Sequence, residues 1–250
     1  MATVAGQVEH PERLATQEVS YASEGAKIPG YLARPRENGR YPGIVILHDI
    51  FGVSDHARDV ARRFANVEFV VLVPNCFARI EIGTDETIDK IRVRAGQLED
   101  RLTVRDIEGA AALLRSLPYC NGKAGTVGFC MGGRLVYLMS AASKDLKAGV
   151  MFYGSSTMVP FGEGPSPFDR TREIHCPIQG HFGAEDQNPS PEDMRKLDAE
   201  LGRHGKAHEF YSYPGANHAF MNRRGARYHA QADRDSWPKA LAFFEKQLGR

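Results

Sequence analysis

Residues 126–133, with the sequence Thr-Val-Gly-Phe-Cys-Met-Gly-Gly, constrain the fold more than any other part of the chain. They predict a short apolar strand, a one-residue bend at Cys130, and then a helix. Gly128 and Gly132 leave room for the strand and the helix to approach each other. The N–H of Met131 starts the helix and faces the place where an oxyanion would form. We therefore predict that Cys130 is a nucleophile, the alternative being an inert buried thiol.

The length and composition fit one α/β domain. No low-complexity or long polar linker divides the 250 residues, so we expect a polar arm over 1–16 and a single domain over 17–250. A net charge of +1 gives no general attraction to nucleic acid or to an anionic membrane. The N-terminus lacks the pattern of a signal peptide, and no apolar run approaches transmembrane length. We expect a cytoplasmic protein without nucleic-acid or membrane partners.

The cysteines are scattered and form no C-x-x-C pair, which favours reduced thiols over a disulfide framework. They are Cys76, Cys120, Cys130 and Cys176. A zinc site made by His175, Cys176 and His181 is an alternative, but its spacing matches no usual ligand pattern. We expect no metal and no other cofactor.

Strands alternate with helices along the chain, which predicts a mainly parallel central sheet flanked by helices on both faces. Two antiparallel strands are expected at 18–22 and 28–33, with Pro29 confining the second to an edge or an end. Later strands are expected at 43–48, 69–74, 124–129, 148–153, 176–183 and 207–213. Helices are expected at 54–65, 102–117, 132–143, 191–203 and 226–248, the last interrupted near Pro238. The charged segment 75–100 is expected to hold a loop and an insertion.

Two acid–base candidates follow later strands, Asp186 after 176–183 and His218 after 207–213. In parallel sheets ligands bind beyond the carboxyl ends of the strands, where Cys130 also lies. The order nucleophile, acid, base is that of α/β-hydrolases. We predict Cys130 as nucleophile, His218 as general base and then acid, and Asp186 as the group that orients the imidazole. Glu185 is the nearest alternative to Asp186.

The strand at 43–48 ends in a carboxylate, an apolar pair and a glycine. The N–H of Ile50 is expected to complete an oxyanion hole with that of Met131. Asp49 is expected to contact the resting thiol. Its alternative role is that of a solvated or capping residue in a strand-end turn.

The chain resembles the dienelactone hydrolase family of α/β-hydrolases, the carboxymethylenebutenolidases. The resemblance runs from about Glu18 to the C-terminus and rests on residues 48–53, 119–123, 128–133 and 218–220. It implies an α/β-hydrolase fold and a Cys-Asp-His triad that cleaves small esters or lactones through a thioester, without a metal. We expect a small-molecule substrate and a monomer or homodimer.

The chain departs from the family pattern at the carboxylate before Ile-Phe-Gly. This residue is typically Glu in the family, where it hydrogen-bonds the resting thiol and takes its proton when substrate binds. Here it is Asp49, one methylene shorter, which leaves its reach to the sulfur open.

A second departure concerns the arginines that clamp the substrate carboxylate in family members that open dienelactone. The arginine after the catalytic histidine is replaced by Asn222, with Arg223 next along the chain. Arg92 or Arg94 is the candidate for the other. The substrate-binding candidates are therefore Arg94 and Arg223, together with Phe51 and Tyr153 at strand ends.

Two other classes of function stay open. One is a thiol-based redox or regulatory protein with Cys130 as sensor, although no resolving-cysteine motif is present. The other is a catalytically weak binding module on the same fold. The intact set of Cys130, Asp186 and His218 favours hydrolysis over both.

Overall fold

The structure is a computed structural model that describes residues 6–81 and 87–249. Residues 1–5 of the predicted arm and 82–86 of the predicted insertion lie outside the described residues. The described chain forms an eight-stranded sheet in the order β1-β2-β4-β3-β5-β6-β7-β8, with β3 to β8 parallel and β1 and β2 antiparallel. The strands are β1 (Leu14–Ser23), β2 (Ala26–Pro35), β3 (Tyr41–Leu47), β4 (Val70–Pro74), β5 (Cys120–Phe129), β6 (Leu146–Phe152), β7 (Ile178–Gly183) and β8 (His208–Tyr213).

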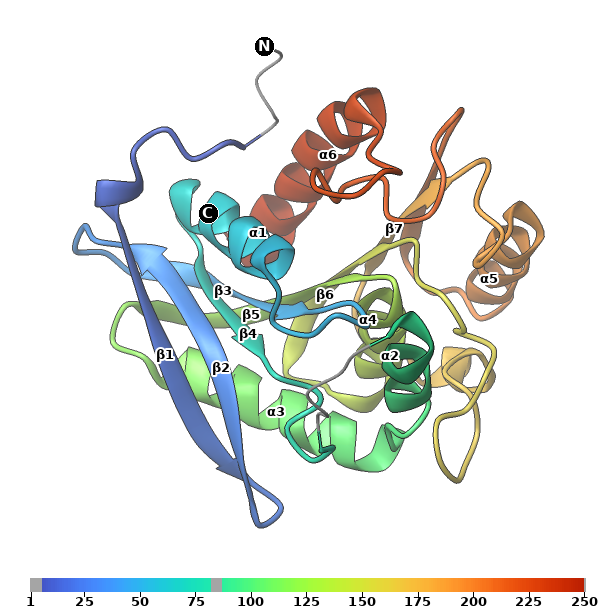
Figure 1. Cartoon of the computed structure of the whole chain (residues 1–250), viewed down its shortest axis with the longest axis horizontal. Helices are drawn as coiled ribbons and strands as arrows, with labels where there is room; N and C mark the ends of the chain where they lie inside the picture. The colour runs from blue at the N-terminus through green and yellow to red at the C-terminus, as the bar shows by residue number, and fades with distance from the viewer. Residues whose placement is uncertain (1–5, 82–86, 250) are drawn as a thin grey trace.

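Helices cover both faces of this sheet, as the sequence predicts (Figure 1). Helices α1 and α6 pack on one face, while α3, α4 and α5 pack on the other. The helices are α1 (Asp55–Asn66), α2 (Ile88–Ala95), α3 (Asp100–Ser116), α4 (Met131–Ala142), α5 (Pro191–Arg203) and α6 (Ala230–Leu248). Two short 3-10 helices span Pro11–Arg13 and Phe168–Glu173. None of the described helices is long and apolar enough to span a membrane.

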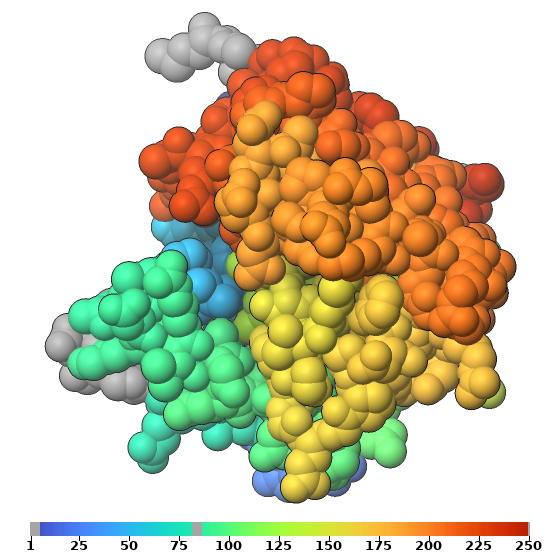
Figure 2. Space-filling view, turned by 90° about the vertical axis from the view of Figure 1, so that its right-hand side faces the viewer, coloured from blue at the N-terminus to red at the C-terminus, as the bar shows by residue number. Residues whose placement is uncertain are grey.

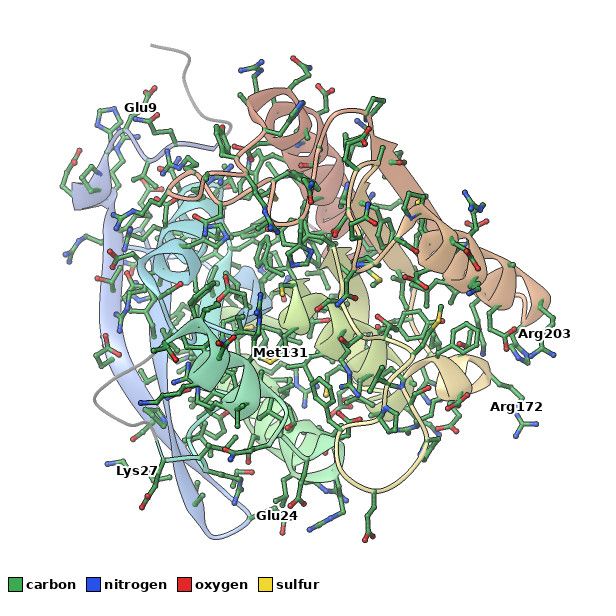
Figure 3. All side chains as sticks on the ribbon, turned by 45° about the vertical axis from the view of Figure 1, so that its right-hand side comes forward. Glu9, Glu24, Lys27, Met131, Arg172 and Arg203 are labelled. Carbon is green, nitrogen blue, oxygen red and sulfur yellow. The ribbon has the colours of Figure 1, made fainter. Side chains whose placement is uncertain are left out.

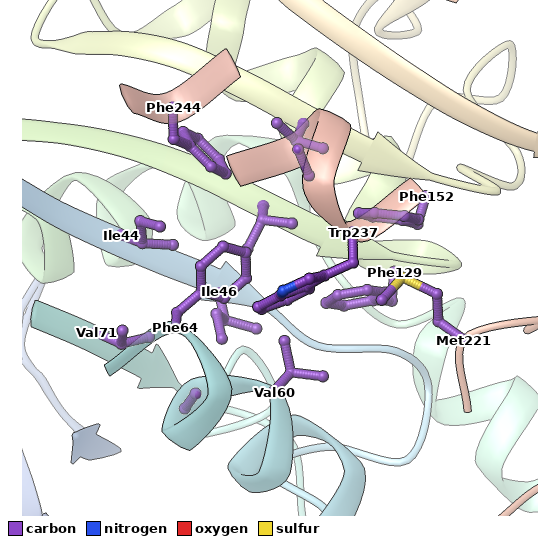
Figure 4. Packing of buried hydrophobic residues seen from close by; sticks show 14 of the residues in the cluster. Ile44, Ile46, Val60, Phe64, Val71, Phe129, Phe152, Met221, Trp237 and Phe244 are labelled. Atoms are coloured by element: carbon purple, nitrogen blue, oxygen red, sulfur yellow. The ribbon is translucent and has the colours of Figure 1, made fainter. Parts of the chain in front are cut away.

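The continuous apolar run of β3 is explained by burial on both faces. Ile44 and Ile46 face the cluster under α1 and α6, where Phe64 and Trp237 pack (Figure 4). Val45 and Leu47 face the opposite cluster. Side chains that alternate between two buried faces must all be apolar, which is why this strand shows no polar alternation.

The N-terminal hairpin differs in detail from the prediction. Strand β1 begins at Leu14, so the last part of the predicted arm, residues 14–16, belongs to the sheet. Strand β2 lies inside the sheet, between β1 and β4, and not at an edge. Its Pro29 directly precedes Gly30, where pairing with β4 begins. The proline thus lies at the end of that paired stretch, which is how the sheet tolerates its missing N–H.

The predicted interruption of the last helix near Pro238 is wrong. Helix α6 begins at Ala230 and continues through Pro238 to Leu248. A proline inside a helix removes one backbone hydrogen bond. Here the neighbouring apolar face, which buries Trp237 and Phe244 against the sheet, offsets that loss.

Candidate active site

Cys130 occupies the sharp turn between β5 and α4. It has a φ of +56°, in the left-handed region that side chains rarely adopt. A Cβ added to Gly128 would collide with the carbonyl of Gly132, and one added to Gly132 would collide with the carbonyl of Leu47. Both glycines are therefore required by the close approach of strand and helix. Met131 begins α4 near the centre of Figure 3.

Asp186 and His218 form a hydrogen-bonded pair at the ends of β7 and β8. His218 Nδ1 lies 2.8 Å from Asp186 Oδ2. The Asp186 side chain is buried, and its other oxygen accepts the N–H of Asn188 at 2.9 Å. Glu185, the alternative considered from the sequence, is exposed. The structure thus places Asp186, and not its neighbour, on the imidazole.

Cys130 as well as Asp186 affects the pKa of His218. Burial lowers the pKa of His218, but hydrogen bonds to Asp186 and Cys130 outweigh burial and raise this pKa to about 10. Because Nδ1 is bonded to Asp186, Nε2 is the nitrogen left for the sulfur. A histidine that keeps its proton at neutral pH is a suitable partner for a thiolate.

The end of β3 and the residue after it pack against the start of α4, because a Cβ added to Gly132 would collide with the carbonyl oxygens of Leu47 and His48. No acceptor for the Ile50 N–H is found among the described residues, and the Met131 N–H belongs to the first helical turn, which has no intrahelical partners. In Figure 2 the light-blue surface of the segment after β3 lies recessed between the teal surface around α2 and the yellow-to-orange surface of later residues.

His48 holds this loop in place, a role the sequence did not reveal. Its Nδ1 lies 2.7 Å from the carbonyl oxygen of Asp49, and its Nε2 accepts the N–H of Cys76 at 3.0 Å. Burial lowers the pKa of His48 to about 4, so the ring stays neutral. A neutral ring donates through one nitrogen and accepts through the other, which matches both contacts.

The expected contact between Asp49 and the sulfur of Cys130 is not seen as a hydrogen bond in the described structure. Its Oδ1 accepts the N–H of Phe51 at 2.9 Å, and among the described residues no hydrogen bond joins it to Cys130. Burial raises the pKa of Asp49 to about 6, although the Phe51 N–H and the charge of His218 oppose the shift. At neutral pH Asp49 is therefore a charged carboxylate, and keeping this charge buried has a cost in the free energy of folding.

That cost predicts that Asp49→Asn stabilises the protein. A folded-state pKa near 6, above the usual value of 3.8, makes the wild type lose stability as pH rises from about 4 to about 6. Asparagine does not titrate in this pH range, so it avoids the loss, and its side-chain oxygen can still accept the N–H of Phe51. We expect the free energy of unfolding at pH 8 to rise by about 2 kcal/mol, measured by urea denaturation.

The gain should vanish below about pH 4, where Asp49 is protonated in both states. Asp145→Asn is the matched control, because Asp145 is exposed and pairs with Arg115 at the surface. Its effect should stay within about 1 kcal/mol at either pH. A gain for Asp49→Asn that is the same at pH 4 and pH 8 would contradict the electrostatic explanation.

Tyr153 and Phe51 flank the site in different ways. Tyr153 is buried, and its ring meets that of His218 edge to face, with 5.1 Å between centroids. Burial and the charges of Asp49 and Cys130 raise the pKa of its phenol, which stays protonated. Phe51 is 51% exposed, an unusual fraction for a phenylalanine, and lies next to Ile50 in the loop after β3.

The two candidate arginines have protein partners. Arg94 is buried over the ring of Phe77, and its Nη2 donates to the carbonyl oxygen of Ile50 at 3.1 Å. Arg223 pairs with Asp59 of α1, with 2.7 Å between Nη2 and Oδ2. Arg94 is thus attached to the loop after β3, whereas Arg223 joins the segment after His218 to α1.

Two residues of the alternative zinc site, Cys176 and His181, are buried. The ring nitrogens of His181 lie 2.8 Å from Tyr213 Oη and 2.8 Å from Gln179 Oε1. Cys176 is buried, and burial raises the pKa of its thiol. Within 6–81 and 87–249, no group of three His, Cys, Asp or Glu side chains is arranged to hold a metal ion.

Known proteins resemble this chain over nearly its whole length. The sequence pattern of the dienelactone hydrolase family matches residues 28–248. A protein of Synechocystis sp., provisionally named a carboxymethylenebutenolidase, is 32% identical over 242 residues, which are 93% of this chain and 97% of that protein. An Escherichia coli K12 protein with the same provisional name is 29% identical and covers 92% of this chain and 87% of its own length.

Solved structures agree with the sequence matches. A provisionally assigned dienelactone hydrolase from Klebsiella pneumoniae has a TM-score of 0.87 and 27% identity, covering 93% of this chain and 99% of that chain. A dienelactone hydrolase-like promiscuous phosphotriesterase from metagenomic libraries shares the fold, with a TM-score of 0.80 and 23% identity over 95% of this chain and all of that chain. This chain therefore belongs to the dienelactone hydrolase family of α/β-hydrolases, and it is a hydrolase of the ester- and lactone-cleaving type.

Proposed function

We propose that the protein hydrolyses small esters or lactones through a thioester acyl-enzyme formed on Cys130. The observation that carries this proposal is the hydrogen bond between Asp186 and His218, together with the influence of Cys130, which helps to raise the pKa of that imidazole. A nucleophile, a base and an orienting carboxylate in that arrangement are the elements of triad catalysis. The sharp turn presents the sulfur at the carboxyl end of the sheet, where substrate has access.

Acylation begins from a Cys130 thiolate paired with protonated His218. The thiolate attacks the carbonyl carbon, a carbon–sulfur bond forms, and the carbonyl electrons move to the oxygen. The N–H groups of Ile50 and Met131 hold that oxyanion. When the intermediate collapses, the carbon–oxygen bond of the ester breaks and the His218 proton goes to the leaving alkoxide.

Deacylation uses the same groups in reverse order. Neutral His218 takes a proton from water, which attacks the thioester carbonyl. The carbon–sulfur bond breaks, the acid is released, and the sulfur leaves as the thiolate. Asp186 holds the imidazole in the orientation that both steps need and stabilises its charged form.

We assign Asp49 an electrostatic part in this cycle. Its carboxylate is turned toward the Phe51 N–H, and its charge interacts with His218. A negative charge near the imidazolium favours the protonated ring that the resting pair requires. Asp49 thus supports His218, in place of the direct contact with the sulfur that the longer glutamate of relatives would make.

The surroundings of the site favour neutral substrates. Arg223 pairs with Asp59, and Arg94 donates to the carbonyl oxygen of Ile50. Exposed Phe51 offers an apolar contact in the loop after β3. A substrate carboxylate would compete with existing partners of both arginines, whereas an uncharged ester or lactone would not.

The decisive experiment traps the acyl-enzyme. The protein is mixed with p-nitrophenyl acetate, quenched in acid and digested, and the acetyl group is located by mass spectrometry. We expect the acetyl group on the peptide that contains Cys130, together with steady release of p-nitrophenol. A matched pair of esters, one neutral and one with a carboxylate on the acyl chain, tests the preference; we expect kcat/KM for the neutral ester to be higher by about tenfold.

A labelled residue other than Cys130 would refute the proposed mechanism. A protein whose thiol is oxidised by stoichiometric peroxide, but which turns over no ester in the panel, would fit the redox alternative instead. Faster turnover of the carboxylate-bearing ester would overturn the assignment of a neutral substrate, and would place an arginine in contact with the substrate.

A further inference from the structure

A serine hydroxyl that no sequence motif marks lies beside the proposed nucleophile. Ser155 Oγ is 3.6 Å from Cys130 Sγ, a distance suited to a hydrogen bond with sulfur. Cys130 follows β5 and Ser155 follows β6, and these parallel strands are paired up to Phe129 and Phe152. The strand ends therefore bring both side chains to the same edge of the sheet.

The backbone fixes the two residues relative to each other. The N–H of Cys130 donates to the carbonyl oxygen of Phe152 at 3.0 Å. The N–H of Ser155 donates in turn to the carbonyl oxygen of Cys130 at 3.2 Å. Because two hydrogen bonds join the segments on either side of the contact, the hydroxyl is placed beside the sulfur before any substrate binds.

The segment that follows Ser155 is also held by hydrogen bonds. Arg134, fully buried on α4, donates from Nε to the carbonyl oxygen of Ser156 at 3.1 Å and forms an ion pair with Asp100. On the other side, the N–H of Ser156 donates to the side chain of Asn188 at 3.2 Å. Ser155 thus belongs to an anchored segment and not to a free loop.

Nothing else competes for this hydroxyl within the part of the chain that the structure describes. Ser155 has no other side-chain hydrogen bond there, and its side chain is half-buried. Asp49 is turned toward the N–H of Phe51. The hydroxyl of Ser155 is therefore hydrogen-bonded to the sulfur, whereas His218 is linked to Cys130 through the raised pKa of its imidazole.

We infer that the Ser155 hydroxyl donates a hydrogen bond to the Cys130 thiolate and acts as a further catalytic residue of this site. The inference deepens the proposed function and rests on it. A hydroxyl that donates to the anion stabilises the thiolate over the neutral thiol, because hydrogen bonds to charged groups are the stronger ones. Ser155 thereby supplies a contact that the shorter Asp49 does not make.

This contact serves both halves of the cycle. Before acylation it raises the fraction of sulfur present as thiolate, the form that attacks. In the thioester the sulfur is neutral and the hydrogen bond weakens. During deacylation the sulfur regains its charge as it leaves, and the hydroxyl stabilises that developing charge.

The test measures thiolate formation directly, through the pH dependence of alkylation by iodoacetamide. The other cysteines are buried, so the reaction reports Cys130, and Cys130→Ala serves as the blank. For Ser155→Ala we expect the midpoint of the profile to move up by about one pH unit and the rate at pH values below the midpoint to fall by about tenfold. Ser155→Thr retains the hydroxyl and should restore the wild-type profile.

Ser116→Ala is the matched control, because it removes a serine hydroxyl at the end of α3, far along the chain from the site. It should leave the alkylation profile unchanged. If Ser155→Ala folds poorly by circular dichroism, Ser155→Gly removes the same hydroxyl with less demand on packing. An unchanged midpoint in a folded variant that lacks the hydroxyl would overturn the inference.

Alkylation does not require ester turnover, so the two proposals can fail separately. A shifted profile in a protein that hydrolyses no ester would retain Ser155 as the thiolate's partner and reject the proposed function. Acetylation of Cys130 and normal turnover in Ser155→Ala, with an unshifted profile, would retain hydrolysis and reject the role of Ser155.

Discussion

Replacement of Cys130 by alanine is expected to abolish ester hydrolysis, lowering kcat by at least about 10⁴-fold while the fold stays intact. The reason is that no other residue at the site offers a comparable nucleophile. Ser155 lies close by, but its hydroxyl has no hydrogen bond to His218, the base that would have to activate it. The measurement is steady-state turnover of p-nitrophenyl acetate, with circular dichroism to confirm folding.

Cys176→Ala is the matched control, because Cys176 is buried before β7 and lies outside the set of side chains around the sulfur. This variant should lose some stability through the small cavity it creates, but it should keep its kcat. Activity of Cys130→Ala near that of the wild type would show that another residue carries the reaction. Equal losses in both variants would point to impaired folding instead of lost chemistry.

The sheet was largely predictable because its strands obey simple rules. A strand such as β3, buried on both faces, needs an unbroken apolar run, and helix α1 is capped by Ser54, whose side chain accepts the N–H of Ala57. Pro238 misled the prediction, since the backbone cost of a proline is local. The burial of Trp237 that compensates for it becomes visible only once the sheet is assembled.

The pairing of Asp186 with His218 could be expected from their positions after successive strands, since parallel strands end at one edge. The direction in which Asp49 points could not. A carboxylate one methylene shorter has two competing partners, and the loop geometry set by His48 decides between them. The sequence does not single out Ser155, because a serine after a strand is common. Its meaning comes from the contact with a sulfur 25 positions away.

Asp186→Asn is expected to lower kcat/KM by about 10³-fold at pH 7 without loss of fold. One Asp186 oxygen accepts from Asn188 and the other contacts His218. An amide retains one of these acceptors and loses the negative charge. The imidazole is then no longer held in the orientation that directs Nε2 to the sulfur, and its charged form loses its stabilising partner.

The Asp186→Asn substitution should also change the pH dependence of kcat/KM in a defined direction. Acylation needs protonated His218, so activity is lost as pH rises through the pKa of that ring, which the Asp186 and Cys130 contacts raise to about 10. Without the Asp186 charge this pKa falls, and the alkaline limb of kcat/KM moves toward neutral pH.

Glu185→Gln is the matched control, because this exposed carboxylate precedes Asp186 but makes no contact with the imidazole. It should keep the wild-type profile. An alkaline limb that stays in place in Asp186→Asn would mean that a group other than His218 delivers the proton to the leaving alkoxide.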